Sequence, residues 1–99
     1  MALTHWGFIY TAPGVDPEGR WSTADTDGCR TELVALRSVE QAPDAARRLA
    51  DQGAQLIELC GAFGPVWTAR VIEAVGGRVP VGAVGYGPEA VDQVHAIFS

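Results

Sequence analysis

The chain has 99 residues, of which 47% are hydrophobic and 19% are charged, and its formal net charge is −5. This length allows one domain, and the composition is that of a globular protein rather than a disordered one. The acidic balance argues against binding to a nucleic-acid backbone, and no stretch is apolar for long enough to span a membrane.

Two cysteines, Cys29 and Cys60, are too few for a disulfide framework. The first six residues lack the basic segment and the long apolar run of a signal peptide. We therefore expect a soluble protein of a reducing, cytoplasmic compartment.

The first half of the chain predicts two strands separated by a long loop. Residues 6–10 form a short apolar and aromatic run, and residues 31–36 form the second apolar run. Residues 13–28 are rich in Pro, Gly and Asp, which indicates a loop with room for a short helical turn around residues 16–22. Trp21 lies within this loop, and we expect it to dock on the core or on a partner.

The second half predicts strands that alternate with helices. A helix over residues 42–52 is expected to carry Pro43 in its first turn and to end at Gly53. The remaining elements follow from the same patterns of apolar residues, Gly and Pro: a strand at 55–59, a helix at 64–75, a strand at 79–84, and a helix from 87 to the C-terminus.

The strand at 79–84 is continuously apolar, as is typical of a central parallel strand with both faces covered. The last helix places Val91, Val94 and Phe98 on one stripe, which predicts a face that packs on apolar surface. The alternation of strands and helices predicts a single α/β domain, residues 1–99, with a mainly parallel four-stranded sheet in the order β-(long loop)-β-α-β-α-β-α.

Several segments carry a resemblance to a known family. The string Glu-Leu-Cys-Gly-Ala-Phe-Gly-Pro at 58–65 is its most specific part, and residues 5–10, 28–31 and 81–87 are also similar. The chain resembles a family of small uncharacterised bacterial proteins, the domain of unknown function numbered 6506. The resemblance covers most of the chain. It implies a bacterial, cytoplasmic origin and supplies no catalytic residues.

Two glycine-rich turns are the candidate ligand site. In parallel α/β sheets, ligands bind beyond the carboxyl ends of the strands, where helix N-termini also attract anions. The turns at 60–65 and 85–89 each follow a predicted strand and precede a predicted helix, and glycines there allow close approach of the backbone. The expected ligand-binding residues are Gly61, Gly64, Gly85, Tyr86, Gly87 and Tyr10.

Cys60 and Glu58 are the candidates for catalysis. A thiol just before a helix start is often reactive, and Glu58 lies two residues earlier on the same face of its strand, where it can serve as an acid or base. The alternatives are that Cys60 only fills the core and that Glu58 forms an ion pair with Arg37 or Arg70, or a subunit contact.

The function predicted from the sequence is binding of a small anionic or polar ligand at these turns, with enzymatic turnover left open. The alternative is a structural or interaction protein that forms a homo-oligomer without catalysis, because the many large aromatic side chains suit a subunit interface. No metal-ligand spacing is present, so no metal is expected. No cofactor is expected either, and the acidic charge and the short apolar runs argue against a nucleic-acid or membrane partner.

Overall fold

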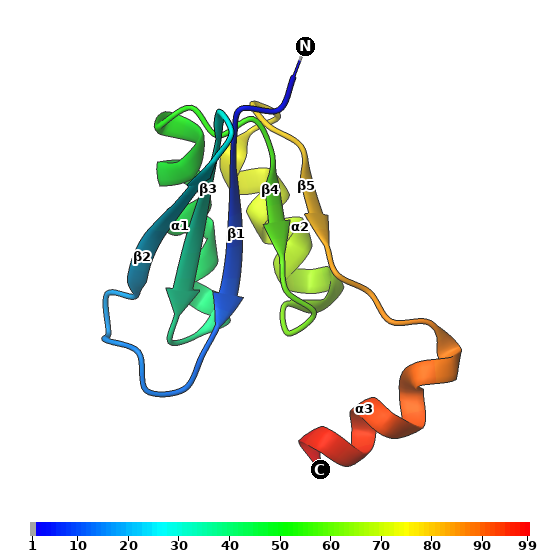
Figure 1. Cartoon of the computed structure of the whole chain (residues 1–99). Coiled ribbons are helices and arrows are strands. Elements are labelled where there is room, and N and C mark those ends of the chain that lie inside the picture. Colours follow the sequence, from blue (N-terminus) through cyan, green and yellow to red (C-terminus); the bar gives the residue numbers. More distant parts are fainter. Residues whose placement is uncertain (1) are drawn as a thin grey trace.

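The computed structural model describes residues 2–99 and is built around one five-stranded sheet (Figure 1). The strands are β1 (His5–Thr11), β2 (Arg20–Thr26), β3 (Cys29–Leu36), β4 (Ile57–Leu59) and β5 (Val81–Ala83), in the spatial order β2-β3-β1-β4-β5. All neighbouring strands are parallel except β2 and β3, which are antiparallel. The predicted α/β class and mainly parallel sheet are confirmed, with five strands rather than four.

The fifth strand is β2, which occupies part of the segment predicted to be a loop. It forms a hairpin with β3 through a two-residue turn at Asp27 and Gly28, both of which have positive φ angles, 45° and 81°. Asp-Gly is a favoured dipeptide for this turn because both positions need a left-handed backbone. The expectation of a continuous loop over residues 13–28, with a helical turn around 16–22, is therefore wrong from Arg20 onward.

Two helices lie where the sequence predicts them. Helix α1 (Ala42–Asp51) follows a short 3-10 turn, η1 (Val39–Gln41), and has Pro43 in its first turn, where a missing N–H costs nothing. Helix α2 (Gly64–Val75) ends at Gly76, whose left-handed conformation forms the C-cap.

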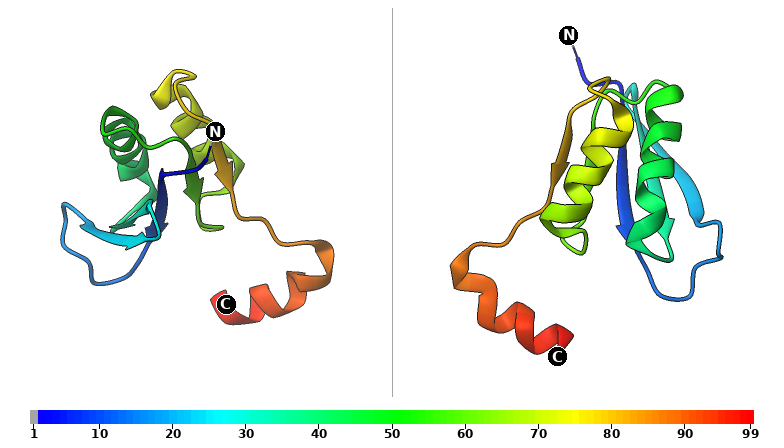
Figure 2. Two further views of the ribbon diagram at one scale, coloured as in Figure 1. Left: turned by 45° about the horizontal axis from the view of Figure 1, so that its top comes forward. Right: turned by 180° about the vertical axis from the view of Figure 1, so that it is seen from behind.

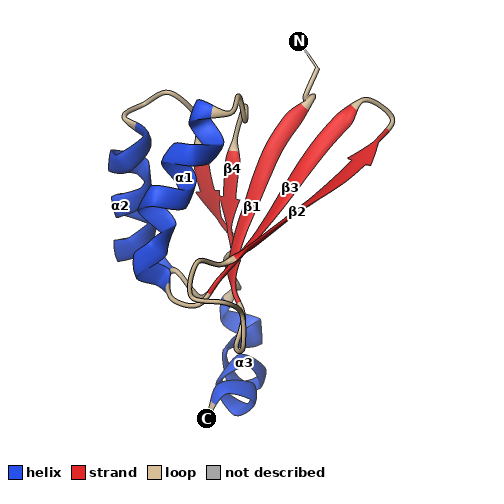
Figure 3. Ribbon diagram, turned by 90° about the vertical axis from the view of Figure 1, so that its left-hand side faces the viewer, coloured by secondary structure: helices blue, strands red, loops and turns tan. Residues whose placement is uncertain are grey.

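Both α1 and α2 cover the same side of the sheet (Figures 2 and 3). Gly7 of β1 allows α1 to approach closely, since a Cβ atom at this position would lie 2.6 Å from the Leu49 Cδ1 atom. The core between sheet and helices contains Ile9, Val34, Leu36, Ile57, Leu59, Ala42, Ala45, Ala46, Leu49, Val71 and Val75. The opposite side of the sheet carries no helix (Figure 3).

Strand β5 is an edge strand, not the central strand that its apolar sequence indicates. Val81 is half-buried, whereas Gly82 and Ala83 are exposed. The reason is topological: the segment after β5 is helical, so no further strand pairs with it.

The last helix is formed but does not pack on the core. After the 3-10 turn η2 (Pro88–Ala90), helix α3 (Val91–Phe98) extends beyond the carboxyl ends of the strands (Figure 1). No residue of α3 is buried, and Phe98 is 84% exposed. The predicted apolar stripe of α3 is therefore present, but it is not buried against the core as expected. Within residues 2–99, no helix combines the length and the apolar character needed to cross a membrane.

Candidate functional site

The two glycine-rich turns lie side by side. Strands β4 and β5 are parallel neighbours in which Leu59 is opposite Ala83, and the Val84 N–H donates a hydrogen bond to the Leu59 carbonyl oxygen at 2.9 Å. The segments that follow, Cys60–Gly61 and Gly85–Tyr86, therefore leave the sheet at the same edge. The strand pairing therefore places the two turns of the candidate site next to each other.

Gly61 brings the two turns into contact. A Cβ atom at this position would lie 3.3 Å from Cε2 of Tyr86 and 3.5 Å from the Val84 carbonyl oxygen. Any larger residue would push against the ring, so the glycine allows Tyr86 to lie over the backbone of the first turn. Tyr86 itself is 68% exposed.

A cavity of about 480 Å³ lies between the first turn and helix α3. Thr11 at the end of β1 forms part of its wall, and Val94 and Phe98 of α3 form the wall opposite the strand ends. A volume of this size suits a small ligand. Its full lining is Thr11, Cys60, Gly61, Ala62, Tyr86, Val94 and Phe98.

A second cavity, of about 620 Å³, lies between the start of α2 and the end of β5. It shares Gly61 and Tyr86 with the first cavity, so these two residues border both cavities. It also contains Gly64 and Gly85, and exposed Ile72 and Val84 make much of its surface apolar.

The linings of both cavities contain no Arg, His, Asp or Glu side chain. Their polar side-chain groups are the hydroxyls of Thr11, Thr68 and Tyr86 and the thiol of Cys60. The Thr68 hydroxyl already donates to the Gly64 carbonyl oxygen at 2.6 Å. Attraction for an anion would therefore come only from the first turn of α2, which has no side-chain cap. This lining favours an uncharged ligand over an anion.

The structure separates the predicted site residues into two groups. Cys60, Gly61, Gly64, Gly85 and Tyr86 line one or both cavities. Tyr10, Gly87 and Glu58 line neither.

These three residues have other surroundings. Tyr10 stacks on Phe8 on the helix-free side of the sheet, with 5.8 Å between ring centroids. Gly87 leaves room for the carboxylate of Glu89, which a Cβ atom would overlap. Glu58 is opposite Phe8 of β1, is exposed, and lies on the helix-free side of the sheet.

The ion pairs suggested for Glu58 are also absent from the described residues. The Arg37 guanidinium donates to the Val15 carbonyl oxygen at 2.8 Å and 3.1 Å. The Arg70 guanidinium lies over the Trp67 ring, 4.6 Å from its centroid. Cys60 is half-buried against the core and also lines the first cavity. The same side chain therefore packs on the core and borders the space open to a ligand.

Sequence reasoning missed a buried carboxylate on β3. Glu32 is 6% exposed, and its Oε2 atom lies 2.7 Å from Nε2 of His5, while Oε1 lies 3.7 Å from the Arg30 guanidinium. The sequence contained a signal for it, because Glu32 interrupts the apolar run at 31–36. These partners compensate a charge that would otherwise be costly to bury.

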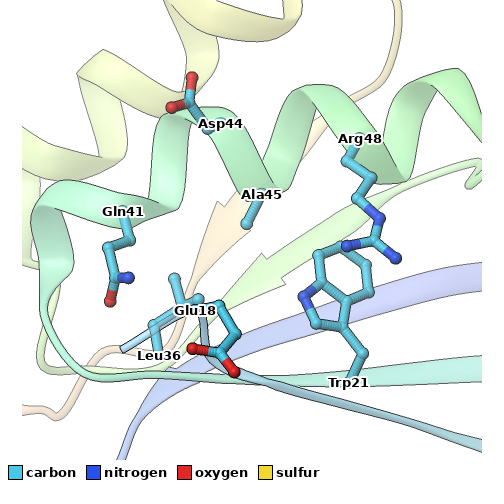
Figure 4. A pocket seen from close by; sticks show the side chains of 7 residues that line it. All are labelled: Glu18, Trp21, Leu36, Gln41, Asp44, Ala45 and Arg48. Carbon is cyan, nitrogen blue, oxygen red and sulfur yellow. The ribbon is translucent and has the colours of Figure 1, made fainter. Parts of the chain in front are cut away.

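Trp21 lies between two polar hollows on the α1 side of the hairpin. The Arg48 guanidinium stacks over its ring at 4.0 Å from the centroid, as Figure 4 shows. One hollow, of about 230 Å³, includes Glu18, Gln41 and Asp44, and the other, of about 440 Å³, includes His5, Arg30 and Glu32. The expectation that Trp21 docks on the core is confirmed.

Residues 2–99 contain no group of three or more His, Cys, Asp or Glu side chains placed to hold a metal ion.

Residues 4–99 match the sequence model of a family described as a family of unknown function (DUF6506). The chain belongs to this family, as its sequence motifs indicate. Among curated proteins, none is significantly similar to the chain.

Proposed function

We propose that this member of a family of unknown function binds a small, uncharged ligand where the turns after β4 and β5 meet. One observation carries the proposal: two cavities of ligand size flank the contact between Gly61 and Tyr86 at the carboxyl ends of parallel strands. Such ends are the usual ligand position in open parallel sheets.

The lining indicates the class of ligand. An apolar body would lie against Val94 and Phe98, and polar groups of the ligand would bond to the Thr11 and Tyr86 hydroxyls. Apolar pockets with a few polar groups are typical of small-molecule sites. Because no cationic side chain lines either cavity, we narrow the anionic or polar ligand suggested by the sequence to an uncharged polar one.

The proposal covers binding and assigns no reaction. The Cys60 thiol lines the first cavity, whereas Glu58 is exposed and does not line it. A nucleophilic role of Cys60 is tested separately, by its rate of alkylation. A rate no faster than that of Cys29, a second half-buried thiol, would count against this role.

NMR titration of the ¹⁵N-labelled protein tests the binding. We expect a panel of uncharged aromatic fragments, including indole and phenol, to shift the amide signals of Gly61 and Gly85 saturably, whereas inorganic phosphate and citrate leave them in place. Anion-induced shifts confined to the first turn of α2, with no response to the fragments, would overturn the uncharged-ligand proposal.

A variant that fills the first cavity tests the site, and the same substitution elsewhere on the surface is the matched control. Ala62 is exposed and lines the first cavity, so Ala62→Phe should occupy ligand space without disturbing the core. We expect it to weaken fragment binding at least about tenfold, the effect of losing one good apolar contact. Ala2→Phe, an exposed substitution at the opposite end of β1, should leave binding unchanged.

A second candidate function is self-association without catalysis, as the sequence also allowed. It is favoured by the helix-free side of the sheet, where Trp6, Phe8 and Tyr10 are only half-buried. Light scattering tests it: a mass above that of one chain supports self-association, and a monomer at all concentrations contradicts it.

A further inference from the structure

The side of the sheet away from α1 and α2, called here the open face, is defined by strand alternation. Ile9, Val34 and Leu59 point toward the helices, so their strand neighbours point the other way. The strand residues on the open face are Trp6, Phe8, Tyr10, Arg20, Ser22, Ala24, Thr26, Cys29, Thr31, Leu33, Ala35, Glu58 and Gly82.

The centre of the open face is apolar. Phe8 and Tyr10 of the middle strand stack on each other, and Leu33 and Ala35 lie beside them on β3. A sheet face that meets water usually alternates polar residues outward, and this one carries aromatic rings instead. Such a face is normally covered by a second layer.

No described element of this chain provides that layer. Helices α1 and α2 both lie on the other side, and α3 extends beyond the strand ends (Figures 2 and 3). We propose that the open face is covered by the open face of a second copy of this chain, packed sheet on sheet about a two-fold axis.

The dimensions of the face suit a small dimer interface. The four strands that overlap in the orientation described below, β2, β3, β1 and β4, hold 7, 8, 7 and 3 residues, and at about 4.8 Å by 3.3 Å a residue they give a face on the order of 400 Å². Two such faces bury on the order of 800 Å², the size of a weak or transient interface. Aligned sheet packing of this kind is common in sandwiches of two sheets.

The charges on the open face select the orientation. Arg20 and Glu58 are the only charged residues among its strand positions, and they lie on opposite flanks, on β2 and β4. An axis parallel to the strands, between β3 and β1, places β2 of one copy over β4 of its partner. Arg20 then faces the partner's Glu58, twice per dimer.

The heights of the two residues along the sheet are compatible with this pairing. Arg20 pairs with Ala35, which in turn pairs with Tyr10, and Glu58 pairs with Phe8. Along the strand direction, the positions of Arg20 and Glu58 therefore differ by two residues, or about 7 Å. The long Arg side chain can span that offset. The other axis within the interface, perpendicular to the strands, would instead stack β4 on β4 and bring two Glu58 carboxylates together, which is unfavourable.

The net charge argues for a second copy rather than a membrane surface. A chain with net charge −5 is repelled by anionic lipid, and the open face offers only Arg20 as a cation. The inference rests on the self-association proposed above and adds its surface and its symmetry.

Sedimentation equilibrium on full-length charge-reversal variants tests this geometry. We expect a wild-type dimer that Arg20→Glu and Glu58→Lys each weaken at least about tenfold, because each brings like charges together. The double variant Arg20→Glu/Glu58→Lys should restore the wild-type dissociation constant. Both side chains are exposed, and circular dichroism would verify that each variant folds.

Two control variants change charge on the α1 and α2 side of the molecule. Glu73→Lys and Arg47→Glu reverse exposed charges there and should leave the dimer unchanged. A monomeric wild-type protein would overturn both self-association and this inference. A dimer that neither reversal weakens would retain self-association and overturn the open-face geometry, and so would a double variant that remains as weak as the single ones.

Discussion

At the scale of single residues, the structure depends on two positions where size or charge is tightly constrained. Gly7 is buried beneath Leu49 of α1, and Glu32 is buried between His5 and Arg30. The sequence shows both as irregularities within apolar strands. A glycine inside a strand often marks a close approach, but which element approaches is decided only by the fold.

Gly7→Ala should destabilise the protein because the new methyl group would overlap the fully buried Leu49 side chain. Overpacking of a core costs about 1–3 kcal/mol of unfolding free energy, measurable by urea denaturation. The matched change Gly82→Ala places its methyl group in open space and should be neutral or slightly stabilising. Equal losses in the two variants would contradict the placement of α1.

Glu32→Gln should lower the unfolding free energy by about 1–3 kcal/mol, because the substitution weakens the hydrogen bond between this buried side chain and His5. The control Glu73→Gln alters an exposed carboxylate on α2 and should change stability by less than about 0.5 kcal/mol. An unaffected Glu32→Gln variant would show that the pair is not a stabilising feature.

At the scale of elements, local patterns predicted α1, α2, β1, β3 and the neighbouring parallel pair β4 and β5. Their apolar periodicity and their Gly and Pro boundaries are local properties. Strand β2 was missed because its outer residues are polar and the preceding segment is rich in Gly and Pro. The Asp27–Gly28 dipeptide before a predicted strand was the available hairpin signal.

The environment of an element could not be predicted in the same way. The edge position of β5 and the detachment of α3 depend on which segments pair at long range. The stripe on α3 predicts an apolar face but does not specify what covers it. For the same reason, Glu58 was grouped with Cys60 and Gly61, which line the first cavity, although it lies on the open face.

Truncation after Tyr86 should leave the core folded, since α3 contains no buried residue. We expect a change in unfolding free energy of less than about 1 kcal/mol, the range for surface changes. Fragment binding should nevertheless weaken, because Val94 and Phe98 form one wall of the first cavity. Loss of cooperative unfolding in the truncated chain would contradict the description of α3 as separate from the core.

At the scale of the whole molecule, the chain has one well-packed side and two incompletely covered surfaces. The packed side lies between the sheet and helices α1 and α2, and the others are the open face and the cavity beside α3. Small domains bury a limited core, so association through an apolar face adds stability. The wild-type midpoint of thermal unfolding should therefore rise with protein concentration, whereas that of Glu58→Lys should rise less.

The most direct test of the ligand site is an isotope-filtered NOE measurement on the labelled protein with the tightest-binding uncharged fragment. We expect contacts from the fragment to the Tyr86 ring and to Val94 and Phe98. Contacts confined to Trp6 and Phe8 on the open face would show that the fragment binds exposed apolar surface, and would contradict a ligand site at the glycine turns.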